Sequence, residues 1–232
     1  MRTEMEQWPS LAFVPITGTI LFYLLPHTYQ EYTITQFMPQ ILAYLGLGIW
    51  ASTNDNVRIR LGIQTTHVWT GLLWGCLIGL LLGIGNSYII LYIVPILEKD
   101  ITFLAQTPHA QVPTLLMIPW TISVIAIAVE FNFRGFLLGR LISLITYIQR
   151  PRRPSDKFSE HLKHSIAILL SALIFTFDPF MVSTFQHLHW IALWDGIIWG
   201  WMWVRLRNLY AVMAAHAIEV MVLYLWIKTA LN

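Results

Sequence analysis

The chain has 232 residues, of which 56% are hydrophobic and 11% are charged, and its formal net charge is +2. Because an ordinary soluble domain carries about 25% charged residues, this composition excludes a water-soluble globular protein. The mean hydropathy is +0.62, and the small net charge, with its basic residues scattered along the chain, excludes a nucleic-acid partner.

The apolar residues fall into seven blocks, in chain order 11–25, 37–52, 66–97, 115–131, 164–177, 189–204 and 209–227. A helix needs roughly 20 residues to cross a hydrocarbon core about 30 Å thick. Runs such as LLWGCLIGLLLGIG are apolar on every face, whereas the strands of a membrane barrel alternate. The sequence therefore predicts an all-α, polytopic membrane helix bundle with seven to eight transmembrane helices.

Two stretches of the chain are irregular. The third block contains the sequence GIGNS around Gly85, which predicts a helix followed by a bent segment. After the fourth block, Arg134 and Arg140 interrupt an apolar helical pattern, which predicts a helix that leaves the membrane at an angle. The polar stretch 150–163 that follows is predicted to be a basic loop.

The basic residues lie in alternate connections, which are Arg2, Arg58 with Arg60, the stretch 150–163, and Arg205 with Arg207. Connections rich in Lys and Arg stay on the cytoplasmic side, so the N-terminus is predicted to be cytoplasmic. An eighth crossing near residues 131–149 would reverse the C-terminal tail. We expect one integral membrane domain over residues 1–232, with motif-free helices in 1–113 and the polar motifs in 114–232.

Ionisable residues inside the predicted spans are few, and each costs about 2.5 to 3.5 kcal/mol on insertion scales. Glu130 and Arg134 are four residues apart in VEFNFRGFL, so a helix places them on one face. Two interpretations remain open: a neutralising ion pair, or a Glu130 that points into a polar cavity while Arg134 orients it or a partner.

A second polar pair is His216 and Glu219 in MAAHAIEVMV, three residues apart on one helical face. Side chains with this spacing can both reach one metal ion or one water molecule. The alternative is a hydrogen bond between the two buried groups. Small residues that precede the pair, Ala211, Ala214 and Ala215, would let a neighbouring helix approach closely.

Asp178 follows the apolar run SALIFTF and precedes Pro179. An Asp-Pro pair commonly ends a helix or begins a turn, and this interpretation stands beside that of a functional carboxylate.

The order of these elements resembles the CPBP family, also called Abi, of intramembrane proteases, which includes the CAAX prenyl endopeptidases. The resemblance covers roughly residue 129 to the C-terminus, and the family pattern is EExxxR, then FxxxH, then HxxxN or HxxxD. Glu130 matches the second glutamate, Arg134 the arginine, Phe175 the phenylalanine and His216 the histidine of the third motif.

Three positions depart from the pattern. The first glutamate, which the family uses to activate water, is Val129; the histidine of FxxxH is Pro179, and the asparagine or aspartate of the third motif is Val220.

The resemblance leaves two functions open. The first is an intramembrane endopeptidase that cleaves a membrane-associated or prenylated peptide, with Glu130, Arg134 and His216 as catalytic residues. In that case Asp178, His216 and Glu219 are the candidate ligands of a divalent metal such as zinc. The second is a catalytically inactive subunit, a pseudoenzyme, that binds or stabilises a partner membrane protein in the bilayer. A proton-relaying transporter is weaker, because the sequence shows no internal repeat.

Overall fold

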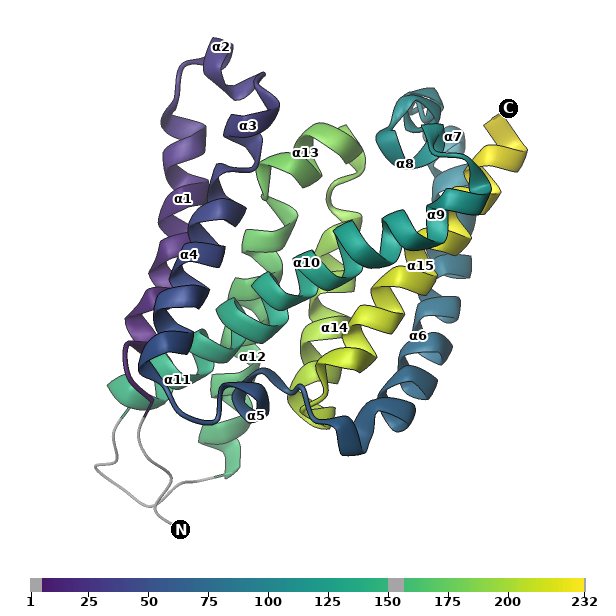
Figure 1. Cartoon of the computed structure of the whole chain (residues 1–232). Coiled ribbons are helices and arrows are strands. Elements are labelled where there is room, and N and C mark those ends of the chain that lie inside the picture. Colours follow the sequence, from purple (N-terminus) through teal and green to yellow (C-terminus); the bar gives the residue numbers. More distant parts are fainter. Residues whose placement is uncertain (1–5, 150–156, 232) are drawn as a thin grey trace. The chain divides into compact units, whose positions relative to one another are not determined.

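The computed structural model describes residues 6–149 and 157–231, and these residues form helices and no strands (Figure 1). The all-α prediction is confirmed. The chain divides into two compact units, one made of Met1–Gly62 and Phe131–Arg205, the other of Ile63–Glu130 and Leu206–Asn232. The expectation of a single domain with a boundary near residue 113 stays a prediction.

The first unit contains the helices before Gly62 and the helices that follow Glu130 as far as Arg205. Its elements are η1 (Pro9–Ala12), α1 (Phe13–Leu24), α2 (His27–Gln30), α3 (Thr33–Gln36), α4 (Met38–Thr53), α5 (Val57–Leu61), the π-helical η6 (Phe131–Leu138), α11 (Gly139–Ile148), α12 (Lys157–Thr176), α13 (Pro179–Phe185), η7 (Gln186–Leu188) and α14 (Ile191–Leu206). Helices α1 and α4 lie side by side (Figure 1). They approach so closely at Gly18 that a Cβ atom there would lie 3.0 Å from the Cα of Pro39.

The second unit is built around α6 and α15, which lie side by side (Figure 1). Its elements are η2 (Thr65–His67), α6 (Val68–Tyr88), the π-helical η3 (Ile89–Ile93), α7 (Val94–Ile96), η4 (Thr102–Gln106), α8 (Pro108–Gln111), α9 (Thr114–Trp120), the π-helical η5 (Thr121–Ala126), α10 (Ile127–Glu130) and α15 (Leu209–Leu231).

Close packing of α6 on α15 depends on four glycines spaced one turn apart, Gly71, Gly75, Gly79 and Gly83. A Cβ atom on Gly79 would lie 2.5 Å from the carbonyl oxygen of Ala215, and one on Gly75 would collide with Ala211 and Ala214. Small residues allow helix backbones to approach in this way. The expectation that the alanines of this segment admit a neighbouring helix is confirmed.

The bend predicted at GIGNS is wrong. Helix α6 continues as an α-helix through Gly85 to Tyr88, and the irregular π-helical turn η3 begins only afterwards. A Cβ atom on Gly83 would lie 3.2 Å from the Cα of Glu219, so this glycine is needed for helix packing and not for a break.

One helix of 35 residues runs over Thr114–Ile148, so the helix continues past residue 131, and the end predicted there for the fourth membrane span stays a prediction. Arg134 and Arg140, on which the prediction of a helix leaving the membrane at an angle rests, are both buried in the structure, and that prediction also remains untested. Of the predicted basic loop, residues 150–156 lie outside the described residues, and residues from Lys157 on already belong to α12.

Among the described residues, three helices are long and apolar enough to cross a membrane: Val57–Ile96, Thr114–Ile148 and Leu209–Leu231. The bent pair Glu160–Thr176 and Pro179–Leu188, with 57° between its halves, makes a fourth if it is one span. The count of seven to eight stays a prediction.

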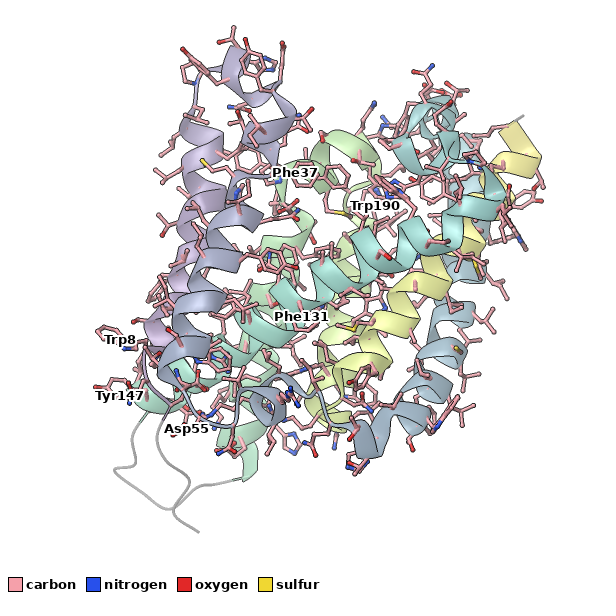
Figure 2. All side chains as sticks on the ribbon, in the orientation of Figure 1. Trp8, Phe37, Asp55, Phe131, Tyr147 and Trp190 are labelled. Carbon is pink, nitrogen blue, oxygen red and sulfur yellow. The ribbon has the colours of Figure 1, made fainter. Side chains whose placement is uncertain are left out.

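The surface of α6 away from its glycines carries large apolar side chains. Trp69 is 84% exposed, Leu73 71% and Leu81 65%, and Figure 2 shows such side chains projecting outward along the helices. In water this face would be costly to expose, whereas hydrocarbon is its favourable surrounding.

Candidate functional site

Two buried ionisable side chains of the second unit, Glu130 and His216, lie within hydrogen-bonding distance of each other. The Nδ1 atom of His216 lies 2.7 Å from the Oε1 atom of Glu130, and the two residues are 4% and 0% exposed. The residues are 86 positions apart, so tertiary packing alone brings them together. The structure thus joins two of the three predicted catalytic residues.

Glu130 owes its position to an irregular stretch of helix. It ends the four-residue α10, which lies between the π-helical segments η5 and η6. A π-helical turn inserts an extra residue into the helix and shifts the face on which later side chains lie, and such turns are frequent at functional sites. His216 lies two turns inside α15, a regular helix.

Glu219 lies one turn beyond His216 and is 4% exposed. Its Oε1 atom accepts a hydrogen bond of 2.7 Å from the Nδ2 group of Asn86 on α6. Asn86 itself is 2% exposed. Asn86 was not singled out from the sequence, because GIGNS was interpreted as a helix break.

The second unit also contains a second buried histidine, His109 of α8. It is 4% exposed, and its ring stacks on that of Tyr224 with centroids 5.1 Å apart and an interplanar angle of 25°. Burial lowers the pKa of His109 to about 4, and the nearby His216 adds a smaller electrostatic contribution in the same direction. His109 is therefore neutral at pH 7. Sequence reasoning missed it.

Arg134, the third predicted catalytic residue, belongs to the first unit. It is 1% exposed, and its guanidinium carbon lies 4.5 Å from the ring centroid of Phe175 and 4.9 Å from that of Trp199. Flanking aromatic rings stabilise a buried guanidinium through cation–π attraction. Its predicted ion pair with Glu130 stays a prediction.

Asp178 also belongs to the first unit and caps α13. Its Oδ1 atom accepts hydrogen bonds of 3.1 Å from the backbone N–H of Phe180 and from Nε2 of Gln40. With Pro179 as the first helical residue, this is the turn that the Asp-Pro pair predicts. The part of the chain that the structure describes holds no group of three or more His, Cys, Asp or Glu side chains arranged to bind a metal. The set of Asp178, His216 and Glu219 stays a prediction.

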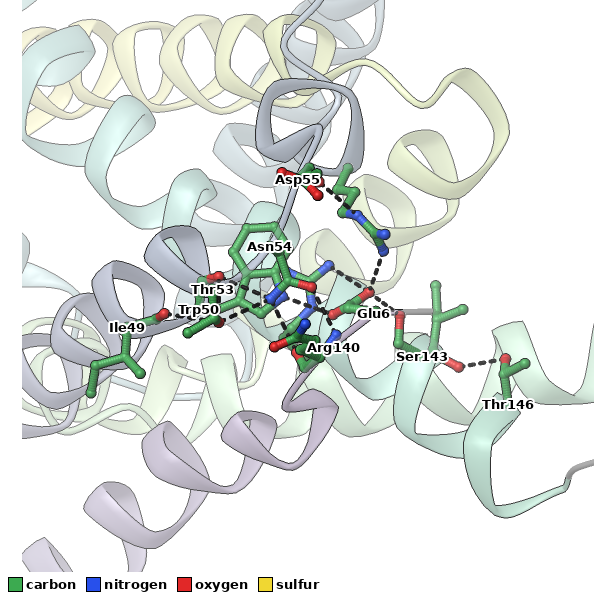
Figure 3. A network of polar contacts seen from close by, with 12 residues as sticks. Glu6, Ile49, Trp50, Thr53, Asn54, Asp55, Arg140, Ser143 and Thr146 are labelled. Atoms are coloured by element: carbon green, nitrogen blue, oxygen red, sulfur yellow. Dashed lines mark hydrogen bonds and ion pairs between the residues drawn. The ribbon is translucent and has the colours of Figure 1, made fainter. Parts of the chain in front are cut away.

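The first unit contains another polar network that the sequence did not reveal, centred on Glu6 (Figure 3). The carboxylate of Glu6 accepts hydrogen bonds from Trp50 Nε1 at 2.9 Å, Ser143 Oγ at 2.5 Å and Arg60 Nη1 at 3.3 Å, and it pairs with Arg140. The Arg140 guanidinium also stacks on the Trp50 ring, with its carbon 3.7 Å from the centroid. This network ties the segment before η1 to α4, α5 and α11.

Apolar helices of spanning length and a buried pair of ionisable side chains define the class of protein: an integral membrane protein with a candidate hydrolytic centre inside its helices. Residues 111–222 match the family model described as Type II CAAX prenyl endopeptidase Rce1-like. This part of the chain is therefore a domain of the Rce1-like CAAX prenyl endopeptidase family, and the predicted kinship with CPBP membrane proteases is confirmed. No curated protein and no solved structure matches the chain.

Proposed function

We propose that the protein is an intramembrane endopeptidase that hydrolyses a peptide bond in a membrane-associated, prenylated peptide. The observation that carries the proposal is the 2.7 Å contact between Glu130 and His216, both buried. Two ionisable groups are costly inside a membrane protein, and such residues usually serve function. The Rce1-like domain that contains both residues supplies the substrate class.

In the proposed reaction, Glu130 is the general base and takes the place of the family glutamate that is Val129 here. It accepts a proton from water while the water oxygen forms a bond to the peptide carbonyl carbon, and the carbonyl electron pair moves to oxygen as an oxyanion. His216 holds the carboxyl group in place through its Nδ1 atom. When the oxyanion collapses, the C–N bond breaks and the proton passes from Glu130 to the leaving nitrogen.

The proposed steps are written without a metal, since they need only the direct contact between Glu130 and His216, and the divalent metal is kept as a separate proposal. Cleavage should then survive incubation with 1,10-phenanthroline. Loss of cleavage with the chelator and its return with zinc would instead support the predicted metal.

Kinetics on the purified protein in lipid vesicles, with a farnesylated peptide that ends in a CAAX sequence, tests the proposal. Glu130→Gln and His216→Ala should each lower kcat by about 100-fold to 10,000-fold, the usual contribution of a positioned base. The exposed pair of His27 and Glu31, with Nδ1 and Oε1 3.3 Å apart, provides matched controls. His27→Ala and Glu31→Gln should leave kcat unchanged, and full activity of Glu130→Gln would contradict the proposal.

A non-catalytic subunit is the second candidate, and Val129, Pro179 and Val220 favour it, since each replaces a polar residue of the family pattern. In that case the wild-type protein cleaves no prenylated peptide. Glu130→Gln then changes only the recovery of a partner membrane protein that is purified with the chain.

We further propose that the chain crosses the membrane seven or eight times with a cytoplasmic N-terminus. The shorter apolar helix Pro9–Leu24 and the apolar blocks 37–52 and 189–204 support additional crossings, and the basic residues in alternate connections support the orientation. After Cys76, the single cysteine, is changed to Ser, Tyr29→Cys should react with an impermeant maleimide from outside the cell and Asn56→Cys should not. The reverse labelling pattern would invert the topology.

A further inference from the structure

Building on the proposed endopeptidase function, we propose that His109 is a further catalytic residue, whose imidazole N–H donates a hydrogen bond to the oxyanion formed on the peptide carbonyl. No motif of the family pattern includes this position. The inference comes from where the ring of His109 lies within the second unit.

The ring of His109 contacts both helices that carry the reacting pair, at Trp120, ten residues before Glu130, and at Tyr224, eight residues after His216. One face stacks on Tyr224, which lies two turns beyond His216 on α15. It also contacts the ring of Trp120 edge-on, with centroids 6.5 Å apart and an interplanar angle of 61°. Trp120 ends α9, in the same helix that carries Glu130.

Hydrogen bonds fix the short α8 segment on both sides of His109. Before it, the hydroxyl of Thr107 lies 3.2 Å from the Tyr224 hydroxyl. After it, the ammonium group of Lys228 donates to the carbonyl oxygen of Val112. A donor that stabilises an oxyanion has to be positioned before the reaction, and these two contacts anchor the segment to α15.

The electrostatic state of His109 suits this role. Burial and the neighbouring His216 lower its pKa to about 4, so at pH 7 the ring is neutral and carries one N–H group. The neutral ring can donate its N–H to the developing negative charge of the oxyanion without carrying a charge of its own. The ring neither forms nor breaks a covalent bond, and the proton taken from water still passes from Glu130 to the leaving nitrogen.

The proposed role also fits a departure of this chain from the family pattern. The histidine of FxxxH is Pro179 here. The second unit, which contains Glu130 and His216, therefore obtains a second imidazole from a segment that precedes all three motifs.

Steady-state kinetics on the full-length protein in vesicles, with the farnesylated peptide, tests the proposal. His109→Phe retains an aromatic ring to stack on Tyr224 but has no N–H, and it should lower kcat by about 100-fold with KM within about twofold, as expected for removal of one oxyanion donor. His109→Gln restores an N–H donor and should regain about tenfold of that loss. His109→Leu replaces the Phe variant if the latter does not fold.

Unchanged kcat in folded His109→Phe or His109→Leu overturns the proposal, as does a Gln variant no better than these. The same set includes Glu130→Gln, so that the two proposals fail separately. If Glu130→Gln abolishes cleavage while His109→Phe does not affect it, only the role of His109 is lost. If wild type itself does not cleave, both proposals are overturned.

Discussion

Asn86 and Glu219, 133 residues apart in the chain, are joined by a hydrogen bond of 2.7 Å between two buried side chains. Asn86→Leu keeps a similar volume but removes the donor, so the buried carboxyl group of Glu219 loses this partner. We expect the free energy of unfolding in detergent to fall by about 1 to 3 kcal/mol. Ser87→Ala, at the next position of α6, is the control: it removes a buried hydroxyl to which the described residues give no hydrogen-bond partner, so it should be neutral or stabilising.

The glycine row of α6 leads to a second prediction. Gly79→Ala places a Cβ atom 2.5 Å from the carbonyl oxygen of Ala215, which is backbone and cannot rotate away. The helices have to separate, and overpacking of this kind costs about 1 to 3 kcal/mol. Thermal unfolding measures the loss. Gly85→Ala in the same helix meets no atom within 4 Å, and it should be neutral or stabilising by up to about 1 kcal/mol.

Glu6 provides a third prediction, because it compensates the buried guanidinium of Arg140. Glu6→Ala leaves that charge without its carboxylate, and removal of one partner of a buried pair costs about 3 to 5 kcal/mol. Glu6→Gln preserves an acceptor for Trp50 and Ser143 and should cost clearly less. Equal unfolding temperatures for the two variants would argue that the charge of Glu6 is unimportant.

A fourth prediction concerns pH and His109. Its folded-state pKa of about 4 lies below the ordinary value of 6.5, so the unfolded chain binds the proton first as the pH falls. His109 therefore lowers stability progressively from about pH 6.5 to about pH 4, by up to roughly 3 kcal/mol. Wild type should therefore lose stability relative to His109→Phe as the pH falls. Unfolding free energies of the two proteins, measured from pH 7.5 to pH 4.5, test this. A difference independent of pH would contradict the lowered pKa.

The helical segments could be predicted from the sequence because each depends on a continuous apolar run, which the chain shows directly. The tertiary partners of these segments could not be predicted: Phe175 and Trp199, whose rings flank Arg134, lie far along the chain. The segment GIGNS was interpreted as a break because its Gly83 belongs to the row that packs on α15, and without knowledge of that helix such glycines suggest a flexible sequence.

The candidate site could be predicted only in part for a similar reason. Glu130 and His216 stood out because ionisable residues are rare in apolar runs. Helical spacing alone suggested a local partner for each, Arg134 and Glu219, and it was the family resemblance that placed Glu130 and His216 in one catalytic site. Asn86 is uncharged, and His109 lies in a polar connection where a histidine is unremarkable. Only tertiary packing brings these two residues into the second unit's polar centre.

The construction of the second unit from two distant stretches of chain has a consequence for biogenesis. Synthesis proceeds at about 5 to 20 residues per second. The 133 residues between Asn86 and Glu219 then take about 7 to 27 s to translate. During that interval α6 has been made and α15 has not, so its glycine face and its amide lack their eventual partners. Completion of the Glu130 and His216 pair is correspondingly a late event in the life of the nascent chain.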